Sequence, residues 1–237
     1  TTSNRSILFD LKGKPVFSSQ KEFTQYFPKS GWVEHNPEEI WRTTLKTLKD
    51  VIQKAKRLKG KVLSIGITNQ RETTVLWDKK TGKPVYNAIV WQDRRQEEFC
   101  KKLRKQNKDT MIFNKTGLLI DSYFSGTKIK WILDNVSKAK HLMNKKQLLF
   151  GTIDSFLIWR LTRGKIHATD ATNASRTMIY DISSNRWDDT IWNLLKIKKH
   201  ILPEVKDCAD DYGQTHSSIT GKSIPINGVV GDQQSAT

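Results

Sequence analysis

Short apolar segments alternate with longer amphipathic ones along this chain. Residues 62–68 and 88–91 are runs of mostly apolar side chains, many of them β-branched, and they predict short buried strands. Residues 73–78 predict another strand directly after the first, closed by a turn at 79–82. The polar stretch between residues 68 and 73 is therefore expected to lie at the end of a buried strand.

The clearest helix signal begins at Asn36. This residue can cap a helix, Pro37 fits the first helical position, and Glu38 and Glu39 place acids in the first turn. The apolar spacing that follows predicts an amphipathic helix to about residue 56.

The rest of the pattern adds strands and helices in alternation. A hairpin is expected from strands at 6–10 and 16–19, and further strands at 148–150, 166–169 and 177–181. Helices are expected at 94–106, 125–133, 155–161 (capped by Asp154) and 187–195, and irregular structure at 207–228. This order predicts an α/β fold with a mixed sheet and helices on its faces.

Composition is that of an ordinary soluble domain. The 237 residues suffice for one large α/β domain or two small ones, with 36% hydrophobic and 27% charged residues. No apolar run is long enough to cross a bilayer, and we expect no membrane span. Cys100 and Cys208 are too few and too far apart for a disulfide framework or a thiolate metal site, which favours a reducing, cytoplasmic setting.

The formal net charge of +17 raises the question of nucleic-acid binding. The lysines are spread over presumptive helices and loops, and no stretch interleaves them with aromatic side chains as a stacking platform requires. We therefore interpret the charge as a solvated lysine-rich surface and expect no nucleic-acid partner.

Arg71 and Glu72 follow the predicted strand at 62–68. A guanidinium group donates hydrogen bonds and a carboxylate accepts them, so together they can hold neighbouring hydroxyl groups of a small polyol. Taken alone, the two residues could equally be a surface ion pair at a strand end.

Eight short motifs follow one another along essentially the whole chain. They are GWVEH at 31–35, NQRETT at 69–74, VWQDRR at 90–95, YFSGTK at 123–128, FGTID at 150–154, LIW at 157–159, TNASRT at 172–177 and GDQQ at 231–234. In these motifs and their order the chain resembles the FGGY family of carbohydrate kinases, and within it the branch that phosphorylates glycerol. The resemblance implies a ribonuclease-H-like domain of the actin-like ATPase fold.

The resemblance also implies a reaction, the ATP-dependent phosphorylation of glycerol to glycerol 3-phosphate. Arg71 and Glu72 would hold the glycerol hydroxyls, Trp91 would form an apolar wall, and Tyr123 would add a hydroxyl contact. The alternative is that Trp91 and Tyr123 have only a structural role, as aromatic side chains of the core.

Asp232 would be the general base that takes the proton of the attacking hydroxyl, with Gln233 beside it. Asp232 could also be a helix cap, because the sequence after it favours a helix. Both roles can coexist at a helix start that faces a cleft.

On the nucleotide side, Thr1, Thr2, Ser3 and Arg5 match a loop that cradles the phosphates of ATP in this family. The resemblance implies that Mg²⁺ accompanies ATP in the full enzyme. The aspartate that the family links to this ion would precede Thr1, so we expect no metal ligand in this sequence. The expected first strand is truncated, which would leave two unpaired strand edges and an apolar slot between them.

The resemblance implies a division into an N-terminal, glycerol-binding domain at 1–230 and the start of a hinge at 231–237. An isolated chain of this extent is expected to bind glycerol and ATP weakly and to turn over negligibly, and the resemblance allows a homo-oligomer of the full-length enzyme. Two alternatives stay open: another FGGY sugar kinase, or a basic fragment without catalytic function.

Overall fold

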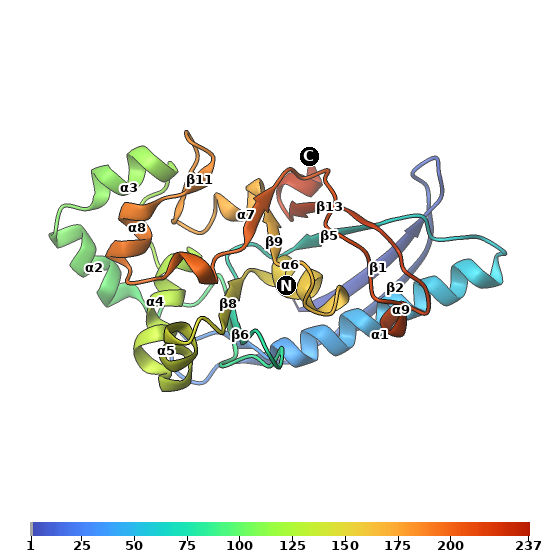
Figure 1. The fold of residues 1–237 in the computed structure, drawn as a ribbon, viewed down its shortest axis with the longest axis horizontal. Coiled ribbons are helices and arrows are strands. Elements are labelled where there is room, and N and C mark those ends of the chain that lie inside the picture. Colours follow the sequence, from blue (N-terminus) through green and yellow to red (C-terminus); the bar gives the residue numbers. More distant parts are fainter. Residues whose placement is uncertain (1) are drawn as a thin grey trace.

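The computed structural model describes residues 2–237, and it begins with a long β-hairpin packed on a long helix (Figure 1). Strands β1 (Ser3–Phe9) and β2 (Pro15–Glu22) pair antiparallel, and helix α1 (Pro37–Arg57) lies against both. The side chain of Asn36 accepts a hydrogen bond from the backbone of Glu38 at 2.9 Å, as a capping residue should. The hairpin and the capped helix are therefore as the sequence predicts.

The other elements form short strands with helices between them. In chain order the strands are β3 (Gln25–Tyr26), β4 (Glu34–His35), β5 (Ile65–Asn69), β6 (Val75–Asp78), β7 (Ala88–Ile89), β8 (Leu148–Gly151), β9 (Ala168–Asp170), β10 (Tyr180–Asp181), β11 (Arg186–Trp187), β12 (Glu204–Lys206) and β13 (Ile226–Gly231). The helices are α2 (Glu97–Lys105), α3 (Asp109–Thr116), α4 (Ser125–Asn135), α5 (Ser137–Asn144), α6 (Ile153–Leu161), α7 (Ala171–Ala174), α8 (Asp189–Leu194) and α9 (Ser217–Thr220). Short 3-10 turns lie at Lys199–Ile201 and Gln234–Ala236.

The pairing confirms a mixed α/β fold, although the strands group into several small sheets. Pairs β5–β13 and β9–β12 are parallel, whereas β1–β2, β6–β8, β10–β11 and the set β3–β4–β7 are antiparallel. Helices α2, α3, α4 and α8 gather at one end of the molecule, and the β1–β2 hairpin with α1 extends to the other (Figure 1).

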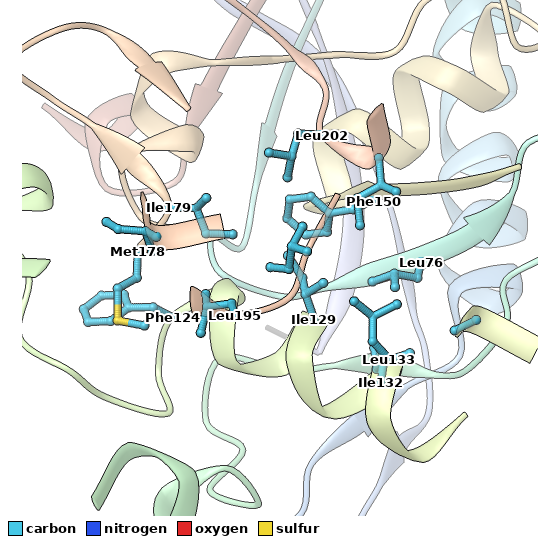
Figure 2. Packing of buried hydrophobic residues seen from close by; sticks show 14 of the residues in the cluster. Leu76, Phe124, Ile129, Ile132, Leu133, Phe150, Met178, Ile179, Leu195 and Leu202 are labelled. Carbon is cyan, nitrogen blue, oxygen red and sulfur yellow. The ribbon is translucent and has the colours of Figure 1, made fainter. Parts of the chain in front are cut away.

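The β6–β8 ladder separates two hydrophobic clusters. Leu76 pairs with Phe150 across the ladder, and both pack with Ile129 and Ile132 of α4 (Figure 2). Trp77 points to the opposite face, where it meets Phe156 of α6 edge-on at a centroid distance of 5.4 Å. Because side chains alternate along a strand, one short ladder is buried on both faces.

Several details differ from the sequence-based expectations. The region 207–228 contains α9 and the start of β13, so it is not irregular throughout. Helix α6 begins at Ile153 and Thr152 is its capping residue, so Asp154 does not cap the helix; it lies fully buried in the first turn instead. The predicted helix at 187–195 is shortened to α8 because Trp187 belongs to β11 and Asp188 is the capping residue.

Strand β5 is shorter and less buried than the pattern at 62–68 predicts. It pairs with β13 on one edge, and a groove of about 890 Å³ lies on its other side, lined also by β1 and α1. Ile7 and Leu63 border this groove and are 40% and 56% exposed. The groove is therefore an apolar slot between the edges of β1 and β5.

No helix within residues 2–237 combines the length and the apolar character that crossing a bilayer requires.

Arg95 joins the segments around β4 and β7 through a buried ion cluster. Its Nη2 donates to Glu34 Oε1 at 2.7 Å and to Asp93 Oδ2 at 2.8 Å, and all three side chains are almost inaccessible to solvent. The guanidinium carbon lies 3.7 Å from the ring centroid of Trp32 and 4.7 Å from that of Trp131. One cation therefore neutralises two buried carboxylates.

We expect Arg95→Leu to lower the free energy of unfolding by about 3–5 kcal/mol, because two buried carboxylates lose their counter-ion. Arg94→Leu is the matched control, since Arg94 and its partner Asp121 are largely exposed, and it should change stability by less than about 1 kcal/mol. Urea unfolding followed by circular dichroism measures both; equal effects would contradict the role given to Arg95.

Candidate active site

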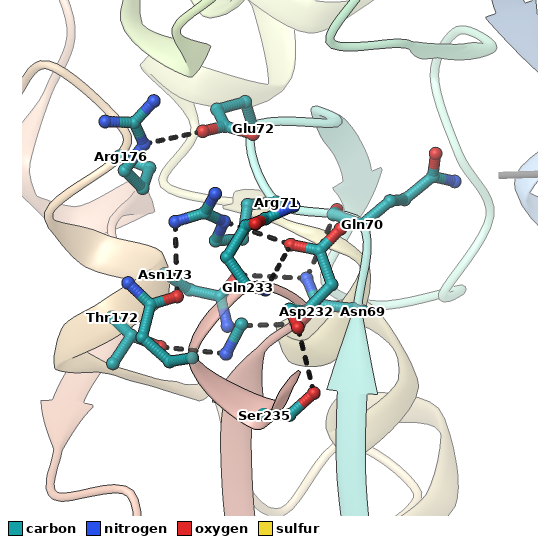
Figure 3. A network of polar contacts seen from close by, with 12 residues as sticks. Asn69, Gln70, Arg71, Glu72, Thr172, Asn173, Arg176, Asp232, Gln233 and Ser235 are labelled. Atoms are coloured by element: carbon teal, nitrogen blue, oxygen red, sulfur yellow. Dashed lines mark hydrogen bonds and ion pairs between the residues drawn. The ribbon is translucent and has the colours of Figure 1, made fainter. Parts of the chain in front are cut away.

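Two parallel strands end side by side at the candidate site. Strand β5 pairs with β13 so that Asn69 lies opposite Gly231, and the chain continues into Arg71 on one side and Asp232 on the other. Arg71 Nε donates to Asp232 Oδ1 at 3.0 Å (Figure 3). Arg71 Nη1 donates to Gln234 Oε1 at 3.2 Å. Residues 161 positions apart in the sequence are thereby in direct contact.

Glu72 is buried beside them but does not pair with Arg71. It has a left-handed backbone with φ of 60° and is 2% exposed. Arg176 Nε donates to Glu72 Oε1 at 2.7 Å (Figure 3). Burial raises the pKa of Glu72 above its usual value of 4.5, and the ion pair with Arg176 opposes that shift. The alternative of a surface Arg71–Glu72 ion pair is therefore wrong.

Aromatic side chains line another side of the site. The rings of Trp91 and Tyr123 lie 5.5 Å apart, both are partly exposed, and the guanidinium of Arg176 lies 5.7 Å from the Tyr123 ring. Burial raises the pKa of Tyr123, and the charge of Glu72 adds to that shift. Trp91 and Tyr123 are therefore not fully buried core aromatics, and Tyr123 lies near the charged residues of the site.

Lys128 fixes the turn that carries Tyr123. Its ammonium group is fully buried and donates to the carbonyl oxygens of Ser122 at 2.8 Å and Phe124 at 3.3 Å, and also to that of Tyr123. Burial lowers the pKa of Lys128 to about 7. The three carbonyl partners compensate part of the desolvation of this cation.

Gln233 and the predicted nucleotide-binding residues make fewer contacts with Arg71, Glu72 and Asp232. Gln233 is exposed, and its backbone N–H donates to Asp232 Oδ1 at 2.9 Å. Gln233 itself is the capping residue of the 3-10 turn Gln234–Ala236, so the alternative of Asp232 as a helix cap is wrong. Ser3 and Arg5 lie in β1, where both bond to Gln20, and they border the same groove as Asp232. Thr2 is exposed beside them, and Thr1 lies outside the described residues.

The buried carboxylate of Asp154, which lies next to Asn69, is held by donors from the protein itself. Between residues 2 and 237, no three His, Cys, Asp or Glu side chains converge as metal ligands. Asp154 is buried with its carboxylate accepting from Thr152, from Asn69 at 3.2 Å and from Thr169 at 2.6 Å. Burial, with the charge of Asp170 adding to it, raises the pKa of Asp154 to about 6, so this carboxyl group is engaged within the protein.

Chemically, the arrangement offers hydrogen-bond donors, acceptors and a proton acceptor around one apolar wall. The side chain of Asp232 is 44% exposed while that of Arg71 is 10% exposed, so the carboxylate is open to a ligand and the cation behind it is held in place. Such a set can orient a small polyhydroxylated molecule and accept a proton from one of its hydroxyl groups.

Arg176 and Lys128 belong to this site and were not among the residues selected from the sequence. Arg176 lies in the motif at 172–177 and Lys128 in the motif at 123–128, so the sequence contained motifs that could have identified them. Arg176 is separated from Glu72 by 104 positions, and nothing in its local pattern identifies that partner.

Comparisons with known proteins identify the family of the chain. The family described as "FGGY family of carbohydrate kinases, N-terminal domain" matches residues 1–237. The glycerol kinases of Rhizobium meliloti and Sinorhizobium fredii are 57% and 59% identical over the whole chain, which covers 48% of each of them. The chain thus spans about half the length of the curated relatives it matches.

Solved structures give the same result. Plasmodium falciparum glycerol kinase with ADP superposes with a TM-score of 0.95 at 37% identity, over 99% of this chain and 47% of that one. Gluconate kinase from Lactobacillus acidophilus superposes with a TM-score of 0.87 at 24% identity, over 100% and 47%, and shares the fold. The chain therefore belongs to the FGGY family of carbohydrate kinases and corresponds to its N-terminal domain.

Proposed function

We propose that this chain is the glycerol-binding part of an enzyme that transfers the γ-phosphoryl group of ATP to glycerol, giving glycerol 3-phosphate. The observation that carries the proposal is the contact between Arg71 and Asp232 next to the buried Glu72. The similarity to glycerol kinases over the full chain supports glycerol as the substrate.

Each candidate residue has one role. Arg71 donates to a glycerol hydroxyl, and Glu72 accepts from a neighbouring one. Trp91 covers the carbon chain, and Tyr123 contributes its hydroxyl group. Asp232 accepts the proton of the attacking hydroxyl as the phosphoryl group arrives, and Gln233 lies next to it in the chain.

The residues proposed to contact ATP lie at the N-terminus of the chain. Thr1, Thr2, Ser3 and Arg5 would approach the phosphates of ATP, and the groove shared by Ser3, Arg5 and Asp232 supports a common location. The ADP named with the Plasmodium relative agrees with nucleotide use. Phosphoryl transfer from ATP generally uses Mg²⁺, and the proposal includes this ion with ATP in the full-length enzyme.

The wider setting follows from the same proposal. Residues 1–230 form the glycerol-binding domain and 231–237 begin the connection to the rest of a longer, cytoplasmic enzyme, which acts on small molecules and not on nucleic acid. A related FGGY kinase with a sugar substrate is the competing function. Rates of ADP formation by the full-length protein with glycerol, xylulose and gluconate distinguish the two, and a preference for either sugar would overturn the choice of glycerol.

We expect Asp232→Asn in the full-length protein to lower kcat for glycerol by about 10²–10⁴-fold, because the amide still accepts from Arg71 but cannot take a proton. The KM for glycerol should change little. Asp211→Asn, at an exposed loop position, is the matched control and should keep the wild-type rate. Steady-state ADP formation measures both, and an Asp232→Asn variant with full activity would exclude Asp232 as the base.

Glycerol binding should also depend on the protonation of Glu72. Protonation removes an acceptor, so KM should rise as pH falls through the pKa of Glu72, by about tenfold per pH unit below it. Arg176→Leu removes the cation that lowers this pKa, so the rise should begin at a higher pH. The exposed Arg186 of β11 provides the control, Arg186→Leu. Identical pH profiles of KM for the two variants would contradict the role of Arg176.

A further inference from the structure

The short helix α7 lies against the ends of both strands, β5 and β13, that lead to Arg71 and Asp232. Thr172 Oγ1 accepts a hydrogen bond from the backbone N–H of Gly231 at 2.8 Å and donates its own proton to Asp170 Oδ2. Gly231 is the last residue of β13 and directly precedes Asp232. One hydroxyl group therefore connects α7 to the backbone next to the candidate base.

The next residue connects α7 to the other strand. The side-chain amides of Asn173 and Asn69 bond reciprocally, with N–O distances of 2.9 and 3.0 Å, and both residues are buried (Figure 3). Asn69 ends β5, and its backbone oxygen accepts from the N–H of Asp232 at 3.1 Å. Asn173 thus positions Asn69, and the backbone of Asn69 binds Asp232.

A third contact from the same segment reaches Glu72. Arg176, two residues beyond α7, makes the ion pair with Glu72 described above. The segment 170–176 therefore bonds to the end of β13, to the end of β5 and to the candidate acceptor for the substrate.

Close packing makes this arrangement sensitive to small shifts. A Cβ atom added to Gly231 would lie 2.4 Å from Cδ of Arg71, which shows that the arginine stem rests on the glycine backbone. A displacement of Gly231 therefore moves both Arg71 and Asp232. Misplacing a catalytic group by about 1 Å can lower a rate by about 10²-fold.

We infer that Thr172 and Asn173 are positioning residues, which set the distance and angle between Asp232 and the polyol held by Arg71 and Glu72. This inference rests on the proposed function. Neither side chain is assigned a contact with the substrate; each acts through the backbone at the end of a strand.

The test compares Thr172→Val, Thr172→Ser and the control Ser175→Ala in the full-length protein. Valine keeps the shape but neither accepts from Gly231 nor donates to Asp170, whereas serine keeps the hydroxyl group. Ser175 bonds within α7, to the carbonyl of Thr172, and touches neither strand end through that bond. Thr172→Val should lower kcat by roughly tenfold or more with the KM for glycerol changed by less than about twofold, while Thr172→Ser and Ser175→Ala should stay near the wild-type kcat.

A second measurement does not depend on activity. Amide hydrogen exchange of the segment 229–233 should be faster in Thr172→Val than in the wild type, and Thr172→Ser should restore its protection. A wild type that does not phosphorylate glycerol would overturn the proposed function. An active wild type with equal kcat values and equal exchange in Thr172→Val and Ser175→Ala would overturn the positioning role alone.

Discussion

The parallel pairing of β5 with β13 is the constraint on which the site depends. Its register brings Asn69 opposite Gly231, and the side chains that follow each strand must therefore emerge at the same edge. The backbone bond from Asp232 to Asn69 extends the ladder by one step beyond the last paired residues. The pairing of the two strands thus brings Arg71 and Asp232 close together, and the ion pair between them adds to that arrangement.

Buried charge beneath this edge is neutralised by specific partners. Glu72 lies against Arg176, Lys128 is surrounded by backbone carbonyls, and Asp154 accepts from three side chains. Leaving any of these groups unpaired would cost several kcal/mol. The polar network therefore has few alternative arrangements, and a site with few arrangements holds its ligand groups in a fixed geometry.

Local signals in the sequence were sufficient for the parts of the fold that depend on neighbours in the chain. Asn36 and Pro37 predicted the start of α1. The turn residues around Gly13, between two short apolar segments, predicted the first hairpin. The strand β13 was missed because its partner β5 is about 160 residues away, and no short window records such a pairing. Asp154 was misassigned for the same reason: it resembles a helix cap locally, yet its partners Asn69 and Thr169 come from elsewhere. Arg71, Glu72 and Asp232 could be selected from motifs, whereas the partnership of Arg176 with Glu72 required coordinates.

The contact between Gly231 and the stem of Arg71 limits how this domain can diversify. No side chain fits at position 231 unless the arginine relocates, because the collision would fall on its aliphatic carbons at 2.4 and 2.8 Å. A substitution at position 231 must therefore be accompanied by a change at position 71. Arg71 and Gly231 thus constrain each other during evolution, although the glycine has no side chain that could contact a ligand.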